Sequence, residues 1–262
     1  MDTHGNTVLV TGGASGIGLA IARAFADLKN RVLICGRNPQ RLEEARRANP
    51  PLHAFRCDIS KPEDVERMFE EIAEEHRGLN VLVNNAGIGL LSSDFPCDDE
   101  ALSKAEREIE TNLVGPLRVT KAALPFLLRN GDAGVITISS ILAIVPMPRT
   151  AIYSATKAAL HSFSISLRHQ LRSTRVRVFE VMPSTVDTDL GRTIPGARLS
   201  PETVARAVLT GVRRETFEIH VGFPAKALYA AHRISPGVAE ILLRRATSGP
   251  AEPAGEPRNV NR

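Results

Sequence analysis

Aromatic residues are scarce in this chain of 262 residues. Tryptophan is absent, and tyrosine occurs only as Tyr153 and Tyr229. The three cysteines show no Cys-x-x-Cys spacing, so we expect neither a disulfide framework nor a thiolate zinc site. Long apolar runs are also missing: none approaches the ~18 residues of a membrane span, and none forms a signal-peptide core near the start. These absences predict a cytoplasmic protein with no membrane span, and the histidines suggest no metal site.

A strong excess of one charge is lacking as well. The chain has 33 Lys+Arg and 29 Asp+Glu, and the resulting formal net charge of +4 is spread along the sequence. Because the basic residues are not interleaved with stacking aromatics, we expect no nucleic-acid partner. A small anionic ligand is compatible with this balance. The hydrophobic fraction of 43% is sufficient for a packed core.

Short apolar runs alternate with stretches of helical period along most of the chain. The helical pattern is clearest at residues 18–29, 63–76 and 151–172. Near-continuous apolar runs are typical of strands that are buried on both faces. The alternation predicts an α/β fold of Rossmann type, a doubly wound, seven-stranded parallel sheet with helices on both faces. The runs expected to form strands are residues 7–11, 31–36, 52–57, 80–83, 134–139, 176–181 and 217–221.

No linker divides the chain, so we predict a single domain over residues 1–246. Within it, residues from about 184 to 215 are expected to form a substrate loop or lid. The amphipathic stretch at about 224–246 is expected to be a helical extension that packs on its own domain. A lid, an oligomer contact and a membrane-surface helix remain alternatives for this stretch. Residues 247–262 are rich in Pro, Gly and Glu and are predicted to be a disordered tail.

A glycine-rich turn follows the first predicted strand and precedes a predicted helix. Glycines at these positions allow backbone N–H groups to approach a pyrophosphate at the positive end of the helix. The strand–turn–helix context favours this interpretation over a purely structural turn. The residues expected to bind the cofactor here are Gly12, Ser15, Gly16, Ile17 and Gly18.

The end of the second predicted strand indicates which dinucleotide is bound. A carboxylate for the ribose of NAD is missing there, since Gly36 ends the strand and Arg37 follows. The planar guanidinium of Arg37 suits a 2′-phosphate, so NADP(H) is preferred and NAD(H) is possible. The alternative is that Arg37 is a solvated surface residue. Asp58 and Ile59 follow the third strand and are expected near the adenine, although Asp58 could instead cap the next helix.

Tyr153 and Lys157 lie four residues apart, so on a helix they share one face. A phenol with a pKa of about 10 is a weak acid–base catalyst at neutral pH, and a neighbouring cation lowers that pKa. Upstream, Ser140 follows the fifth apolar run, at the sheet edge where ligands bind in such folds. The three side chains are therefore candidates for one catalytic site.

These motifs together resemble the short-chain dehydrogenase/reductase family, in its compact single-domain branch. The resemblance rests on the loop 11–18, the segment Asn84-Asn85-Ala86-Gly87, Asn112, Ser140 and the Tyr153/Lys157 pair, and it runs from about residue 7 to 221. The segment from Cys35-Gly36-Arg37-Asn38 to Leu167-Arg168-His169-Gln170, with the C-terminal extension, further resembles bacterial DltE-like members of that family.

The resemblance implies a role for each matching residue. Tyr153 would donate a proton to a carbonyl oxygen or take one from an alcohol, Ser140 would hydrogen-bond that oxygen, and Lys157 would lower the tyrosine pKa and bind the nicotinamide ribose. Asn112 would hold a water. The remaining positions implied to contact the cofactor are Asn85, Ala86, Gly87, Pro183, Val186 and Thr188, together with Tyr153 and Lys157.

Two local features bear on these roles. Pro116 lies four residues after Asn112 and has no N–H, so the carbonyl of Asn112 loses its usual helical partner and the helix should kink. That carbonyl could then bind a water, or the proline could only mark a bend. Ser184 stands where the family usually has a glycine, which leaves the geometry of the loop after Pro183 open.

The sequence thus predicts an NADP(H)-dependent oxidoreductase that interconverts a carbonyl and a secondary alcohol, acting as a ketone or aldehyde reductase with no metal. The alternative is a catalytically idle nucleotide-binding sensor or scaffold of the same fold. Segments 89–98, 141–152 and the loop after Pro183 are expected to bound a pocket for a small substrate with an apolar portion. The family tendency implies a homodimer or homotetramer.

Overall fold

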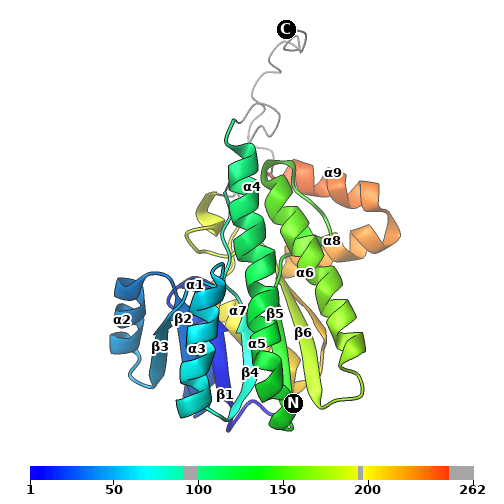
Figure 1. Cartoon of the computed structure of the whole chain (residues 1–262). Helices are drawn as coiled ribbons and strands as arrows, with labels where there is room; N and C mark the ends of the chain where they lie inside the picture. Colours follow the sequence, from blue (N-terminus) through cyan, green and yellow to red (C-terminus); the bar gives the residue numbers. More distant parts are fainter. Residues whose placement is uncertain (91–98, 194–196, 248–262) are drawn as a thin grey trace.

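A computed structural model describes residues 1–90, 99–193 and 197–247 (Figure 1). Its seven strands form one sheet in the order β3-β2-β1-β4-β5-β6-β7, and every neighbouring pair is parallel. The predicted doubly wound sheet is confirmed. The strands are β1 Thr7–Thr11, β2 Arg31–Gly36, β3 Leu52–Arg56, β4 Leu79–Asn84, β5 Ala133–Ile138, β6 Val176–Pro183 and β7 Glu218–Val221.

Helices cover both faces of the sheet. On one face lie α1 (Gly16–Asp27), α2 (Pro39–Ala48) and α7 (Pro201–Arg213), whose buried side chains share a single core with the strands. The other face carries a second core, formed with α3 (Pro62–Glu75), α5 (Gly115–Arg129) and α6 (Ala151–Gln170). The helix α4 (Ala101–Ile109) continues into α5 through a π-helical turn at Glu110–Val114.

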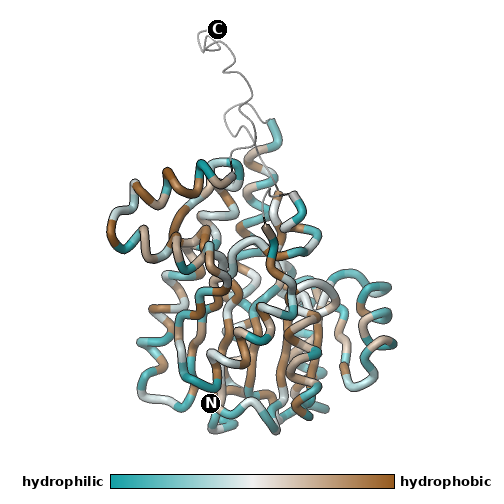
Figure 2. Tube along the Cα trace, turned by 180° about the vertical axis from the view of Figure 1, so that it is seen from behind, coloured by the Kyte–Doolittle hydropathy of each residue, from teal (hydrophilic) through white to brown (hydrophobic). Residues whose placement is uncertain are grey.

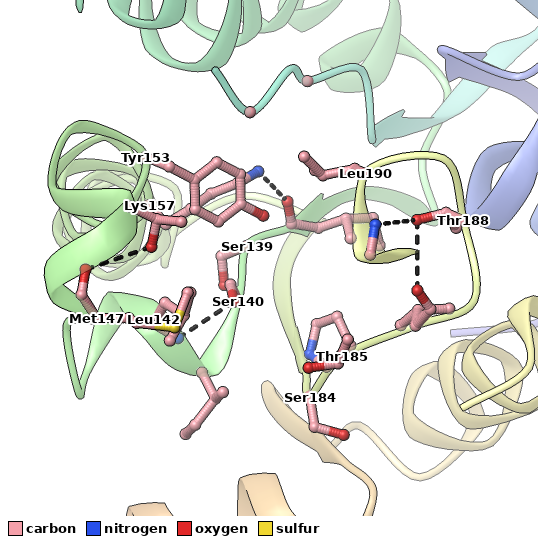
Figure 3. Close-up of a pocket in the computed structure, with 18 of the residues that line it drawn as sticks. Ser139, Ser140, Leu142, Met147, Tyr153, Lys157, Ser184, Thr185, Thr188 and Leu190 are labelled. Atoms are coloured by element: carbon pink, nitrogen blue, oxygen red, sulfur yellow. Dashed lines mark hydrogen bonds between the residues drawn. The ribbon is translucent and has the colours of Figure 1, made fainter. Parts of the chain in front are cut away.

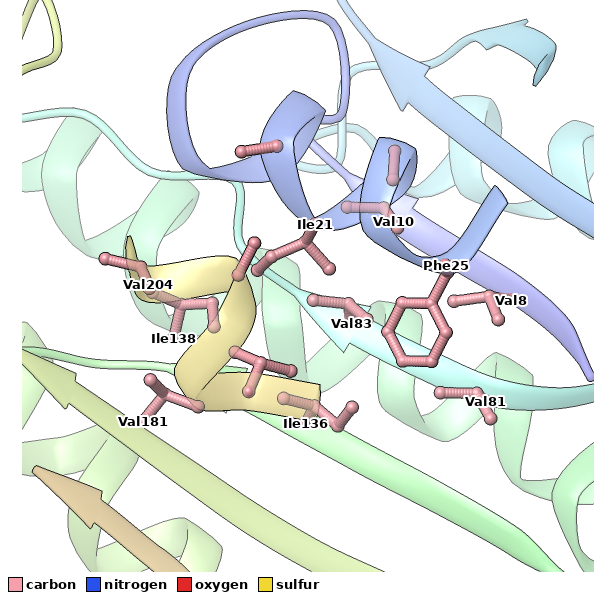
Figure 4. Close-up of a cluster of buried hydrophobic side chains, with 14 of the residues drawn as sticks. Val8, Val10, Ile21, Phe25, Val81, Val83, Ile136, Ile138, Val181 and Val204 are labelled. Atoms are coloured by element: carbon pink, nitrogen blue, oxygen red, sulfur yellow. The ribbon is translucent and has the colours of Figure 1, made fainter. Parts of the chain in front are cut away.

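Strand β1 shows why the strands are apolar throughout. Successive side chains of a strand point to opposite faces, so Val8 and Val10 enter the first core while Leu9 enters the second. In the first core they lie beside Ile21 and Phe25 of α1 (Figure 4). A central parallel strand therefore has no solvent-facing side, which removes the polar alternation of a half-exposed strand.

The topology gathers functional positions at one edge of the sheet. Because all strands are parallel, their carboxyl ends lie together, and the order reverses direction between β1 and β4. Ligands of doubly wound sheets bind at such a switch point. The glycine turn, Arg37, Asp58, the 85–87 segment and Ser140 all follow strands that end at this edge.

Two helices form the C-terminal part of the described chain, α8 (Phe223–Ile234) and α9 (Pro236–Thr247). Pro236 ends the first and begins the second, since a proline disfavours helical backbone before it. Side chains such as Ala225 and Leu243 pack against Val145 in a third hydrophobic cluster. Phe223 and Ile234 are exposed, and Figure 2 shows the hydrophobic stretches of this helical pair.

The structure differs from two expected boundaries. The range 184–215, expected to be a loop or lid, contains α7, whose buried Val204 and Val208 pack in the first core. Its apolar spacing is helical, so this half of the range belongs to the body of the fold. Residues 194–196 of that range and 248–262 of the expected tail lie outside the described residues, and Thr247 ends α9. Among the described helices, none has the length and hydropathy to span a membrane.

Candidate active site

The glycine turn after β1 has the backbone that its sequence predicts. Gly12 has φ +63°, and a Cβ there would lie 2.9 Å from the Cα of Ala86. A Cβ on Gly18 would collide with the carbonyl oxygen of Gly12, so glycine is required for the helix to start so close to the turn. Ser15 is the N-cap of α1 and its side chain makes no capping hydrogen bond. The first N–H groups of α1 are therefore left for an anion.

Strand β4 holds the turn in place through the Asn-Asn-Ala-Gly segment. The Nδ2 of Asn85 donates to the carbonyl oxygens of Thr11 (2.9 Å) and Gly12 (3.2 Å). The backbone N–H groups of Asn85 and Ala86 donate to the Oγ1 of Thr11 at 3.0 and 3.1 Å. Asn85 thus shapes the glycine turn directly.

A cavity of about 420 Å³ lies between the glycine turn and the ends of β2 and β3. It brings together most of the residues predicted to bind a dinucleotide, while Gly18 lies behind the turn and does not line it. Arg41 and Arg192 also line this cavity and were missed by sequence reasoning, because neither belongs to a motif. The predicted residues that do line it are Gly12, Ser15, Gly16, Ile17, Arg37, Asp58, Ile59, Asn85, Ala86, Gly87 and Thr188.

Arg37 follows β2 and Asp58 follows the neighbouring strand β3, and both line this cavity. Arg37 is exposed at the end of β2, and it forms no ion pair with the part of the chain that the structure describes. The carboxylate of Asp58 accepts hydrogen bonds from the Oγ of Ser60 at 2.7 Å and from the backbone N–H of Ser60 at 3.1 Å. Asp58 therefore closes a local turn and does not cap α3, whose N-cap is Lys61.

A second cavity of about 320 Å³ adjoins the first and shares Ile17, Gly87 and Thr188 with it. Ser140, Tyr153 and Lys157 meet in its wall (Figure 3). Ser140 follows β5, and α6 carries Tyr153 and Lys157 on one face. Pro183 and Val186 line the same cavity.

The protonation of Tyr153 is set by burial. Burial raises the pKa of Tyr153 to about 12, the charge of Glu108 acts in the same direction, and a hydrogen bond with Ser140 opposes them. The Nζ of Lys157 lies 5.5 Å from the centre of the tyrosine ring and donates to the carbonyl oxygen of Ile138 at 3.0 Å. Burial lowers the pKa of Lys157 to about 8. Burial is the largest cause of the raised pKa of Tyr153, so the phenol is protonated at neutral pH, and the lowering of this pKa by Lys157 stays a prediction.

Asn112 lies at the centre of the π-helical turn and is fully buried. Its Oδ1 accepts from the N–H of Ile88 and its Nδ2 donates to the carbonyl oxygen of Ile88, both at 2.8 Å. This side chain therefore clamps the segment that follows β4. It does not line either cavity. The helical irregularity expected from Pro116 is present as the π-helical turn, because the proline cannot donate to the carbonyl of Asn112.

The loop after β6 accepts a serine where a glycine is usual. Ser184 does not have a positive φ, so a side chain causes no backbone strain there. Its N–H donates to the carbonyl oxygen of Val221, which extends the pairing of β6 with β7. Further along, the Oγ1 of Thr188 accepts from the N–H of Gly191 at 3.1 Å.

Comparisons with known proteins agree with this geometry. A sequence model described as short chain dehydrogenase matches residues 6–198. The uncharacterized oxidoreductase DltE of Bacillus subtilis is 43% identical over 192 residues, which covers 73% of this chain and 76% of that protein. The chain belongs to the short-chain dehydrogenase/reductase family. It is thus a DltE-like member of a family of oxidoreductases, as the motifs suggested.

Two further members of the short-chain dehydrogenase/reductase family are informative. The crystal structure of a short chain dehydrogenase from Burkholderia cenocepacia in complex with NADP has a TM-score of 0.83 and 28% identity, and it covers 95% of this chain and 100% of its own. Sulfoacetaldehyde reductase 2 of Chromohalobacter salexigens is 34% identical over 186 residues, which covers 70% of this chain and 73% of that protein.

A buried polar cluster lies next to the wall that carries Ser140, Tyr153 and Lys157. Glu180 of β6 is fully buried, accepts from the Oγ of Ser139 at 2.5 Å, and lies 2.7 Å from the Nδ1 of His161. Ser139 precedes Ser140 in sequence, and His161 follows Lys157 by one helical turn. Hydrogen bonding to Glu180 raises the pKa of His161 above its ordinary value of 6.5. The cluster ties β5, β6 and α6 together under the site.

We expect Glu180→Gln to lower the free energy of unfolding by about 3 kcal/mol, because it removes one partner of a buried pair. The raised pKa of His161 means that the pair contributes fully below pH 6.5 and loses this contribution as pH rises through the folded-state pKa. Urea unfolding at several pH values should therefore show the largest loss on the acidic side. Glu218→Gln is the control, since Glu218 lies opposite Glu180 on β7, pairs with Arg168 at 3.7 Å, and acts on His161 through its charge without a hydrogen bond. Equal losses in both variants would contradict the prediction.

Proposed function

We propose that this protein is an NADP(H)-dependent oxidoreductase that interconverts a carbonyl and a secondary alcohol, and that it acts as a ketone or aldehyde reductase. The observation that carries the proposal is that Ser140, Tyr153 and Lys157 lie together in one wall of a cavity. This cavity adjoins a second one, which is lined by residues predicted to bind a dinucleotide. Each of these side chains has a separate task in carbonyl reduction, and a protein that only binds nucleotide has no chemical use for the set.

The residues present fit a dinucleotide. Gly12 and Gly18 allow the tight turn before α1, and the uncapped start of α1 offers backbone donors to a pyrophosphate. Arg37 and Arg41 would supply positive charge to a 2′-phosphate, which supports NADP(H) over NAD(H). The NADP complex of the Burkholderia cenocepacia relative is consistent with this preference.

The chain's own residues account for the proton and the developing charge. The bound reduced nicotinamide would supply a hydride to the carbonyl carbon. Tyr153 is protonated at neutral pH because burial raises its pKa to about 12, and it donates this proton to the carbonyl oxygen as negative charge develops there. The Oγ of Ser140 stabilises charge on that oxygen. Lys157 provides a nearby cation, and a protonated tyrosine is the form that reduction requires at its start.

The walls of the catalytic cavity indicate the kind of substrate. Most of its lining side chains are apolar, as with Leu142, Met147 and Leu228, and the only cation among the described lining residues is Lys157. The Chromohalobacter salexigens relative is named for an aldehyde that carries a sulfonate. Since no further described cation is present to bind a sulfonate here, we propose a substrate with an apolar portion.

The function is tested with the purified wild-type chain, NADPH and a panel of ketones and aldehydes. We expect carbonyl-dependent loss of NADPH absorbance with a turnover number on the order of 1 s⁻¹ or higher for the preferred compounds. Binding of NADPH is measured in parallel by fluorescence titration. Tight NADPH binding with no carbonyl-dependent oxidation across the panel would contradict the reductase and support the idle scaffold.

A further inference from the structure

Glu108 is a buried carboxylate in the catalytic cavity that the proposed reaction does not use. It lies in the last turn of α4, is 1% exposed, and lines the cavity with Ser140 and Tyr153. Its Oε1 accepts a hydrogen bond from the N–H of Leu90. Its Oε2 has no hydrogen-bond donor among the residues that the structure describes. A carboxylate on a side chain this deeply buried is costly unless both of its oxygens are satisfied.

The charge balance of this cavity is unusual for a site that would accept an anion. Glu108 and Lys157 are the only charged side chains among its described lining residues. Lys157 already donates to the carbonyl oxygen of Ile138, and its expected partner is the cofactor. Among the described lining residues, a substrate therefore meets one carboxylate, and the one cation already has a partner.

Glu108 is also close enough to the reacting group to act on it electrically. Its negative charge contributes to the raised pKa of Tyr153, which donates the proton. A substrate whose carbonyl oxygen reaches Ser140 and Tyr153 thus places its neighbouring atoms within the field of Glu108. In a site lined by apolar side chains such a field is weakly screened, so a charge on the substrate interacts strongly with the carboxylate of Glu108.

We propose that Glu108 determines substrate specificity by accepting a hydrogen bond from a hydroxyl or ammonium group of the substrate through its Oε2 and by repelling carbonyl compounds that carry a carboxylate, sulfonate or phosphate. The substrate class is then an apolar ketone or aldehyde with a hydrogen-bond donor near the carbonyl. This inference rests on the proposed reductase function, since it places the carbonyl at Tyr153.

A purely structural carboxylate would behave differently. Holding the N–H of Leu90 requires only the Oε1, and a glutamine offers the same acceptor at the same place. If this were the whole role of Glu108, the charge of a ligand would not matter. Ligand preference therefore separates the two roles, and stability alone does not.

The experiment uses straight-chain methyl ketones of increasing length whose far end is a methyl, a hydroxyl or a carboxylate group. Binding to the full chain is measured by calorimetry with NADP⁺, which cannot reduce a ketone. At the best chain length we expect wild type to bind the hydroxyl ketone at least about tenfold more tightly than the carboxylate. In Glu108→Gln this ratio should fall to about threefold or less, because the repulsion is gone and the acceptor remains.

Glu110→Gln is the matched control, since it removes the same charge two residues away, where the carboxylate pairs with Arg118 at 2.9 Å and is half-exposed. It should leave the ratio unchanged. No preference in wild type, including no binding by the whole series, overturns the proposal, as does an equal change in both variants. The wild-type arm decides even if a variant fails to fold. Ketones that bind with this preference but do not consume NADPH would overturn the reductase and leave the role of Glu108 standing.

Discussion

Replacing Tyr153 with phenylalanine is expected to slow NADPH-dependent carbonyl reduction by about a thousandfold, within the range that general acid catalysis contributes. The phenyl ring keeps the shape of the cavity wall but cannot donate a proton to the carbonyl oxygen. The effect should fall on kcat, since the phenol matters most as charge develops on that oxygen. Steady-state kinetics with the preferred carbonyl compound measure it.

The other tyrosine is a matched control for this variant. Tyr229 lies on α8, where its ring is 4.0 Å from that of His220, and it does not line the catalytic cavity. Tyr229→Phe should therefore leave kcat within about twofold and the affinity for NADPH unchanged. Equal rates for wild type and Tyr153→Phe would remove the proton donor from the mechanism, whatever the cofactor.

Changing Arg37 to aspartate is expected to weaken NADPH binding by about a hundredfold relative to NADH. Hydrogen bonds to charged groups contribute about 1.5–3 kcal/mol, and a hundredfold change corresponds to about 2.7 kcal/mol. The new carboxylate also repels a 2′-phosphate, while it can accept from the ribose hydroxyl of NADH. Because Arg37 is exposed, salt screens part of the effect, so titrations at low and physiological ionic strength should differ.

Arg47 offers a control with the same change of charge. It lies in the last turn of α2, pairs with Glu43 at 2.7 Å, and does not line the cofactor cavity. Arg47→Asp should change the affinities for NADPH and for NADH only slightly, and by the same factor. Arg41→Ala should give a smaller loss of NADPH than Arg37→Asp, since Arg41 also faces Asp189 at 3.3 Å. An unchanged ratio of NADPH to NADH affinity in Arg37→Asp would assign the cofactor preference to other residues.

The candidate positions for catalysis and cofactor binding could be named from the sequence because their signals are local. A glycine turn between a strand and a helix, or a tyrosine and a lysine one turn apart, describes a short piece of backbone with its own geometry. In the structure these pieces converge because parallel strands deliver their carboxyl ends to one edge. The second half of the range 184–215 was less predictable, since a loop composition around Pro183 obscured the helix that begins at Pro201.

The residues that sequence reasoning missed are single side chains without a motif. Nothing near Glu108 distinguishes it from the charged residues around it, such as Glu106 and Glu110. Similarly, Glu180 lies in an apolar strand and gains its meaning only from Ser139 and His161. An apolar strand with one internal carboxylate was the available signal for Glu180, because a charge in that position must find partners.

The sequence by itself determined the order of strands and helices, the glycine turn and the Tyr153/Lys157 pair, since periodicity and short spacings act over a few residues. Only the tertiary structure decided which charges are buried and what they face. Burial raises the pKa of Tyr153 and lowers that of Lys157. Folding also places Glu108 in the wall of the cavity that contains them. These properties depend on segments far apart in the chain coming together, because removing water from a group requires neighbours on every side.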